Sequence, residues 1–166
     1  LSWDRTGGEA DTTEAIERTL AIAVRYAFQP RELAAAVTDN TVLTQANALV
    51  VSMTVAFGAV LGLLVRGHTL DANLSSKLMD LVKSGELPFH AVTTDNLQPP
   101  APGQPEPPRA GLFASPDALL SPSFMAAAAA DPEIRIEPAW KVSLVYGMPC
   151  AIYHMLPAAY YLAARF

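Results

Sequence analysis

The sequence predicts an all-α fold, and three observations lead to this prediction. No run alternates apolar and polar residues with the β-branched enrichment of a strand. Apolar residues instead recur at helical spacing, and Gly and Pro fall where such stretches would begin or end. The 166 residues are 51% hydrophobic and 16% charged, a composition typical of globular chains. We therefore expect residues 1–166 to form a single compact helical domain.

The first expected helix begins near Asp11, which is followed three residues later by Glu14 in a pattern that resembles a capping box. This helix is expected to end near Gln29. Its predicted buried face consists of large apolar residues at helical spacing: Ile16, Leu20, Val24 and Phe28.

Pro30 is suited to the first turn of a short second helix over residues 31–37. The segment Thr38-Asp39-Asn40-Thr41 then has residues that bond their own backbone, which predicts a turn. The same Thr-Asp-Asn sequence occurs at residues 94–96, and turn chemistry explains both more simply than paired catalytic carboxylates.

A long third helix is expected from Thr44 to Arg66, stopped by Gly67. Residues 48–65 carry no charge, and the length of this uncharged segment is close to the minimum for a membrane span. Small and polar residues dilute the segment and no aromatic belt flanks it, so we favour a buried helix and expect no membrane partner. A membrane protein with spans near 48–65 and 142–164 is the alternative.

In the rest of the chain, leucines at 70, 74, 78 and 81 predict an amphipathic helix that ends at Gly85. A Pro-rich loop is expected at 98–109. A further helix is predicted around Met125 and the alanine run at 126–130. The last apolar segment, 140–166, has Pro149 at a position suited to a helix start and Pro157 where a kink or a break is expected.

The charge balance predicts no nucleic-acid partner, because the chain has 11 Lys and Arg against 16 Asp and Glu and no basic run. The single cysteine, Cys150, excludes an intrachain disulfide and favours a reducing, cytoplasmic location. Cys150 and His154 are four residues apart, so they would share one face of a helix that included both. Such a pair could be half a zinc site or a thiol–imidazole pair. The simpler interpretation is that Met148, Cys150, Tyr153 and Met155 fill the core.

One local motif indicates ligand binding. Thr6-Gly7-Gly8, followed by Asp11-Thr12-Thr13 at a helix start, offers flexible backbone and amide groups at the positive end of a helix dipole. Such a place suits a phosphate or ribose hydroxyls. A simple capped loop is the alternative.

Three stretches together resemble the ADP-ribosylglycohydrolase family. TGGEADTTEAIER, residues 6–18, resembles the family's glycine-containing loop and helix next to the ligand diphosphate and ribose. LTQANALVVSMTVAFGAVLGLLVRG, residues 43–67, is similar to its Leu-Thr-His segment and long buried helix, with Gln45 at the histidine position. YGMPCAIYHMLPAAYYLAARF, residues 146–166, is similar to its late helix.

The resemblance implies an all-helical hydrolase that removes ADP-ribose from proteins or small molecules with two magnesium ions. It implies ligand contacts at Gly7, Gly8, Gln45 and Tyr146, with ADP-ribose or an ADP-ribosylated substrate as partner. The family's metal motifs would lie before Leu1 and after Phe166, so we expect part of a longer protein that is inactive alone, with no catalytic or metal-binding residue in this chain. A catalytically inactive binding or scaffold protein of the same fold is the alternative.

A partial domain would leave apolar surface uncovered. We therefore expect self-association through surface around Val50, Phe57, Leu61 and residues 160–162.

Overall fold

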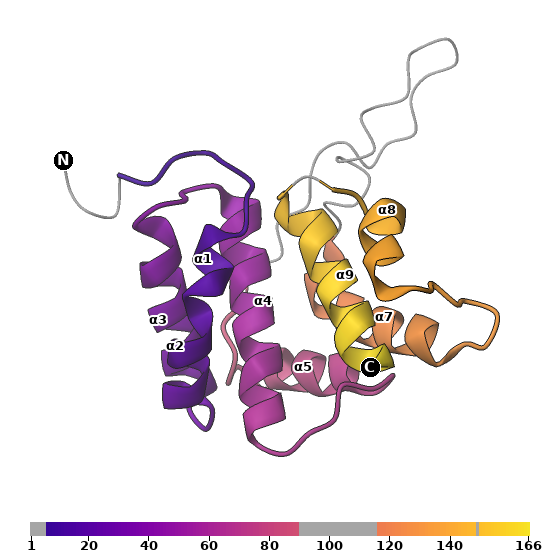
Figure 1. The fold of residues 1–166 in the computed structure, drawn as a ribbon. Helices are drawn as coiled ribbons and strands as arrows, with labels where there is room; N and C mark the ends of the chain where they lie inside the picture. Colours follow the sequence, from indigo (N-terminus) through magenta and orange to yellow (C-terminus); the bar gives the residue numbers. More distant parts are fainter. Residues whose placement is uncertain (1–5, 90–115, 149) are drawn as a thin grey trace, which may run out of the picture.

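Helices follow one another along the described chain; the earlier ones pack around one central helix, and the later ones pack mainly against each other (Figure 1). The computed structural model describes residues 6–89, 116–148 and 150–166. Over these ranges no strand forms, and β-type backbone pairing is limited to isolated bridges between Gly8 and Gln45 and between Thr12 and Ala151. The all-α prediction is therefore confirmed. The α-helices are α1 Glu14–Glu17, α2 Thr19–Tyr26, α3 Pro30–Val42, α4 Ala48–Val65, α5 Leu74–Lys83, α7 Ser121–Ala130, α8 Val142–Tyr146 and α9 Ile152–Arg165, with 3₁₀ turns η3 Pro116–Leu119 and η4 Ala139–Lys141.

Helix α4 is the centre of the molecule, and α2 and α3 pack along one side of it (Figure 1). It begins at Ala48 because the Asn47 side-chain oxygen accepts from the Leu49 amide at 2.9 Å. The expected start at Thr44 is wrong, since residues 44–46 instead pair with Gly8. The expected stop is confirmed: Gly67 has a φ of +89°, a conformation that favours glycine.

Helix α4 also has the length and composition of a membrane span, with a mean hydropathy of 2.4 over residues Ala48–Val65. Of this segment, 61% is packed inside the molecule. The core helix of a globular protein has the same length and composition as a membrane span, and burial of this kind is typical of such a core helix.

Small residues allow α2 and α3 to approach α4 closely. A Cβ placed on Gly58 would lie 3.1 Å from a Val37 methyl and 3.2 Å from the Thr19 methyl. A Cβ on Gly62 would lie 3.1 Å from a Leu33 methyl. The α2 face turned to α4 therefore consists of small residues: Thr19, Ala23 and Ala27.

This packing reverses the predicted orientation of the first helical stretch. Three of the four residues of the predicted buried face, Leu20, Val24 and Phe28, are 59%, 56% and 76% exposed, and only Ile16 is half-buried against the core. The stretch is also divided, with α1 ending at Glu17 and α2 ending at Tyr26. Side-chain size misled the prediction, because a close helix contact selects small residues and leaves the large ones outside.

The predicted turn at residues 38–41 is also wrong, because α3 continues to Val42. Two polar residues within it find partners that the helix permits. The Thr41 hydroxyl donates to the Val37 carbonyl at 2.7 Å, and Asn40 accepts from Arg18 at 3.1 Å. Their turn-forming tendency is thereby overridden.

The later part of the chain packs α7 against α9, with α8 beside α9 (Figure 1). Helix α5 starts at Leu74 rather than Leu70 and is followed by Gly85 at a φ of +75°. Helix α9 continues through Pro157, and the interruption lies before it, at Gly147 with a φ of +115°. Pro149, the Pro-rich loop at 98–109 and the second Thr-Asp-Asn sequence lie outside the described residues.

Apolar residues form a main core around α4 and a smaller cluster of Ala129, Val142 and Tyr161. The surface expected to be uncovered is largely enclosed: Val50, Tyr160 and Tyr161 are at most 4% exposed, while Phe57 and Leu61 are half-buried. Large exposed apolar residues lie elsewhere, among them Leu20, Val24 and Phe28 on α2 and its end, and Trp140, Leu144, Val145 and Met148 around α8.

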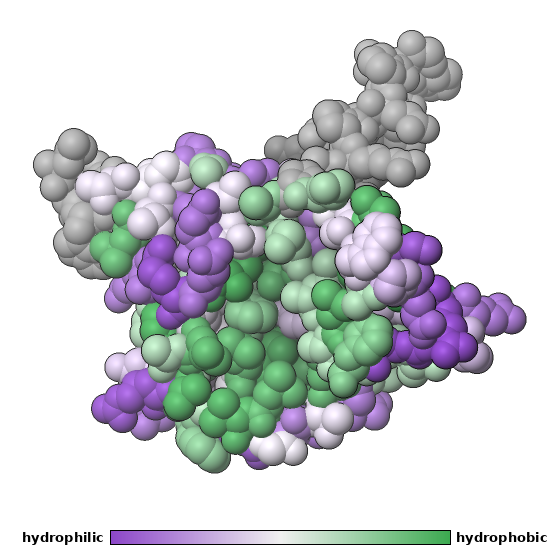
Figure 2. All heavy atoms as spheres, in the orientation of Figure 1, coloured by the Kyte–Doolittle hydropathy of each residue, from purple (hydrophilic) through white to green (hydrophobic). Residues whose placement is uncertain are grey.

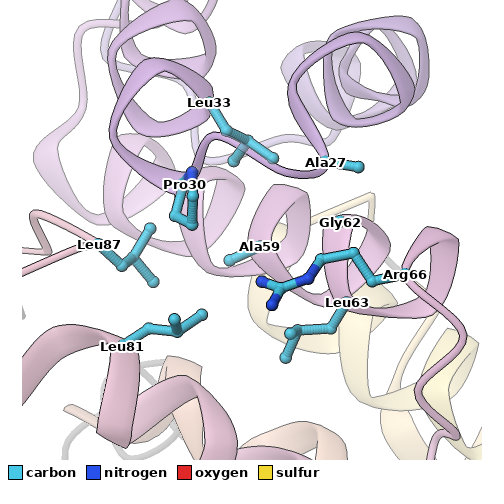
Figure 3. Close-up of a pocket in the computed structure, with 9 residues that line it drawn as sticks. All are labelled: Ala27, Pro30, Leu33, Ala59, Gly62, Leu63, Arg66, Leu81 and Leu87. Atoms are coloured by element: carbon cyan, nitrogen blue, oxygen red, sulfur yellow. The ribbon is translucent and has the colours of Figure 1, made fainter. Parts of the chain in front are cut away.

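A small apolar pocket lies where α2, α3, α4 and α5 meet, and Arg66 points its guanidinium into it (Figure 3). It has room for about one water molecule. Its lining residues are Ala27, Pro30, Leu33, Ala59, Gly62, Leu63, Arg66, Leu81 and Leu87. It is therefore a packing gap next to a cation rather than a substrate site.

Candidate functional site

The loop of residues 6–13 is held against the segment that precedes α4. The Gly8 amide donates to the Thr44 carbonyl at 2.9 Å, and the Ala46 amide donates to the Gly8 carbonyl at 2.8 Å. Both backbone groups of Gly8 are therefore occupied within the protein. Gly8 fixes the position of the loop and has no backbone group left over for a ligand.

Gly7 is required by close backbone contact. A Cβ at this position would lie 2.6 Å from the Val42 carbonyl oxygen and 2.8 Å from the Ala46 nitrogen. Both atoms belong to the backbone, so they cannot move aside as a flexible side chain could. In contrast, the nearest atom to a Cβ on Gly8 is 3.8 Å away, which is an ordinary contact.

Gln45 lies between this loop and α1, and it is only 3% exposed. Its side-chain oxygen accepts from the Ala15 amide at 2.9 Å. Its side-chain nitrogen donates to the Thr12 carbonyl at 2.7 Å and reaches the Glu14 carboxylate at 3.2 Å. The amide is well suited to this place because it supplies a donor and an acceptor at once.

Helix α1 is a single turn of four residues, so the helix dipole expected beside the loop is small. The Ala15 amide in that turn is already bound to Gln45. Hydrogen bonding from the Thr12 hydroxyl lowers the pKa of the exposed Glu14 carboxyl, with smaller contributions from its own backbone amide and Arg18. The anion-binding interpretation therefore depends on the loop rather than on this helix.

Arg18 holds α1 to the end of α3. Its guanidinium donates to the Asn40 carbonyl at 3.0 Å, to the Asn40 side chain at 3.1 Å and to the Thr44 hydroxyl at 2.9 Å. Arg18 was not singled out from the sequence. Its position next to the Thr12–Thr13 segment is the signal that could have drawn attention to it.

The other side of the loop is bound to α9. The Ile152 amide donates to the Asp11 carbonyl at 2.8 Å, and the Tyr153 hydroxyl donates to the Asp11 carboxylate at 2.8 Å. Desolvation and the Asp11 carboxylate raise the pKa of Tyr153 to about 12. Tyr153 is therefore a neutral donor at physiological pH.

Tyr146 lies near this contact but is separated from the loop. It ends α8, is half-buried, and its carbonyl contacts Nδ1 of His154. The His154 ring lies 4.9 Å from the Tyr153 ring, and Tyr153 in turn binds Asp11. Desolvation raises the pKa of the Tyr146 phenol. Of the four predicted ligand contacts, Gly7, Gly8 and Gln45 thus come together, and Tyr146 is joined to them only through other residues.

Two further predictions about this region are wrong. Cys150 precedes α9, so it shares no helix face with His154. Of the four residues expected to fill the core, Tyr153 is half-buried against it, whereas Met148, Cys150 and Met155 are exposed. Met148 and Cys150 lie between the backbone turn at Gly147 and the start of α9, and Met155 lies on the outer side of α9.

Within residues 6–89, 116–148 and 150–166, no three His, Cys, Asp or Glu side chains lie close enough together to hold a metal ion. No protein-family model matches the chain, and no curated protein or solved structure is significantly similar to it.

Proposed function

We propose that this chain is part of an ADP-ribosylglycohydrolase-like protein and that the loop of residues 6–13, with Tyr146, forms one side of a site for ADP-ribose. The intact protein would hydrolyse the glycosidic bond between ADP-ribose and an acceptor.

The observation that supports this proposal is the meeting of three distant segments. The loop 6–13 binds the segment 44–46 through Gly8 and Gln45, and it binds the start of α9 through Asp11. These are the same three stretches that carry the family resemblance. Residues far apart in sequence that converge on one loop are a common arrangement for a binding site.

Gly7, Gly8 and Gln45 have positioning roles in this proposal, because their polar groups or close contacts are used inside the protein. The ligand would meet the outer side of the loop, where Glu9 and Ala10 are exposed. Among the described residues, the amides of Glu9 and Ala10 have no acceptor. Such amides suit a diphosphate, and an aromatic ring such as that of Tyr146 suits a nucleobase.

Catalysis would depend on the two magnesium ions that the family resemblance implies for the intact protein. We propose no ligand for them among the residues of this chain. Binding of ADP-ribose by this chain can be tested without a metal ion.

The test is titration of the isotopically labelled 166-residue chain with ADP-ribose, followed by amide chemical shifts. We expect the largest shifts at Glu9, Ala10 and Tyr146. AMP and ribose 5-phosphate serve as partial ligands and should shift subsets of the same amides. The absence of shifts at millimolar ADP-ribose, or shifts confined to α5 and α7, would refute the proposal.

Gly7→Ala and Gly8→Ala are a matched pair for this test. Gly7→Ala places a methyl group 2.6 Å from a backbone oxygen and should displace the loop, which weakens ADP-ribose binding by at least tenfold. Gly8→Ala meets no such contact and should bind like the wild type. Equal binding by the two variants would show that the loop geometry does not matter for the ligand.

A binding or scaffold protein without catalysis is the second candidate. Gln45 favours it, because a glutamine amide cannot transfer a proton as the family histidine could, and its two polar ends are already bound. The ADP-ribose titration supports both candidates equally. Hydrolysis of an ADP-ribosylated peptide by the full gene product separates them.

A further inference from the structure

Helix α2 turns an unusually apolar side to solvent. Leu20, Val24 and Phe28 are spaced four apart and form a stripe in which each residue is more than half exposed. Figure 2 shows apolar residues gathered over α2 and the adjoining part of α4, below the hydrophilic residues around α1. The largest contiguous apolar patch on a protein surface is often functional.

A second stripe runs beside the first one. Glu17, Ala21 and Arg25 are also spaced four apart, and all three are exposed. Arg18 lies between α1 and α2 with helical backbone angles, a φ of −86° and a ψ of −10°, so the spacing is maintained across the junction. The stripe therefore carries an acid at one end, a small residue at its centre and a base at the other end.

The two charges are available to a partner. In the part of the chain that the structure describes, Glu17 and Arg25 make no ion pair, and the Arg25 guanidinium contacts only the ring of its neighbour Tyr26, at 5.6 Å. Two like helices that cross antiparallel about Ala21 would place Glu17 of each next to Arg25 of the other. This face is thus complementary to itself in charge.

We propose that α2 is the interface of a symmetric dimer, in which a second copy of this chain packs its own α2 antiparallel to the first. The two-fold axis passes near Ala21, whose small side chain lets the helices approach. Leu20 of each copy packs against Val24 of the other, and two Glu17–Arg25 pairs flank this apolar contact. Phe28 lies beyond the charge pairs, opposite the start of the partner's α1.

The available area sets the strength of this dimer. The three apolar side chains expose on the order of 350 Å² per copy, which is a little under half of the ~800 Å² that each partner contributes to a standard interface. A contact of this size corresponds to weak association. We therefore expect a weak dimer in rapid exchange with the monomer, populated at high protein concentration.

The test is sedimentation velocity of the full chain over a wide concentration range. The decisive variants reverse the exposed charges, which do not contribute to the core. Glu17→Arg and Arg25→Glu should each weaken dimerisation about tenfold, since each turns two attractive pairs into two repulsive ones. The double variant, with both charges exchanged, should dimerise like the wild type. Unchanged association in the single variants, or no recovery in the double variant, would overturn the proposal.

Leu20→Asp and Leu144→Asp test the apolar part with a matched control. The two leucines are 59% and 58% exposed, one on α2 and the other on α8. Leu20→Asp should abolish the dimer and Leu144→Asp should leave it intact, with circular dichroism spectra like that of the wild type. Loss of the dimer only with Leu144→Asp, or a wild-type monomer at all concentrations, would contradict an α2 interface.

Discussion

Replacing Gln45 by methionine removes a hydrogen-bonded anchor while nearly conserving its volume. The Ala15 amide, in a residue that is 0% exposed, loses its acceptor, and the Thr12 carbonyl loses its donor at 2.7 Å. Each unpaired buried group costs about 1–3 kcal/mol, so the variant should lose about 3 kcal/mol of unfolding free energy in total. For a chain of this size, that corresponds to a fall in Tm of about 10 °C.

The assay is urea unfolding of the wild type and the variant at neutral pH, followed by far-ultraviolet circular dichroism. The difference in unfolding free energy should appear in the midpoint with little change in slope. A variant within about 0.5 kcal/mol of the wild type would refute the reasoning, because an anchor for α1 and the loop cannot be lost at no cost. Gln45 would then be available for direct ligand contact.

Gln45→Glu refines the same prediction through its pH dependence. A carboxylate there loses the donor to the Thr12 carbonyl and faces Glu14, so burial and like charge raise the pKa of the new carboxyl in the folded state. A folded pKa above the unfolded one means that stability is kept at low pH and lost as pH rises through the folded value. Relative to the wild type, the variant should therefore be least stable at neutral pH and recover in acid.

Three other measurements examine the core and the loop. Tyr161→Phe removes a buried hydroxyl that bonds the backbone at 3.0 Å and should cost about 1 kcal/mol, whereas Tyr160→Phe removes a buried hydroxyl with no partner among the described residues and should keep or raise stability in the same urea assay. Gly58→Leu overpacks the contact of α4 with its neighbours and should lower the unfolding free energy by about 3 kcal/mol. Because burial and the bond to Asp11 raise the pKa of Tyr153 to about 12, protonated Tyr153 contributes stability below pH ~10 that is lost between pH ~10 and ~12. Burial also raises the pKa values of Tyr146 and Tyr160, so absorbance titration should show several late phenols, of which Tyr153→Phe removes one.

The fold class and most helix positions could be predicted from the sequence because helical spacing, Gly67 and Gly85 are local signals. The orientation of α2 could not. Its buried side is set by the glycines of α4, which are more than 30 residues away, and not by the hydrophobicity of α2 itself. The helical state of residues 38–41 was missed for the same reason, since Arg18 supplies a partner for Asn40 from another helix.

The candidate site shows the same limit. The glycine loop and Gln45 could be selected by resemblance, but spacing alone did not indicate that Gln45 is buried and bound to the α1 backbone. The contact between Asp11 and Tyr153 was not predicted either, because no local pattern relates residues so distant in sequence. Only the packed structure brings them together.

The bond between Asp11 and Tyr153 joins residues 142 positions apart. A contact of such high order closes late in folding, because most of the intervening chain must first be ordered. During synthesis, the loop of residues 6–13 leaves the ribosome early but has no α9 to bind until nearly all of this sequence has been made. The loop should therefore acquire its final shape last, which ties the appearance of any binding site built on it to the completion of the helical core.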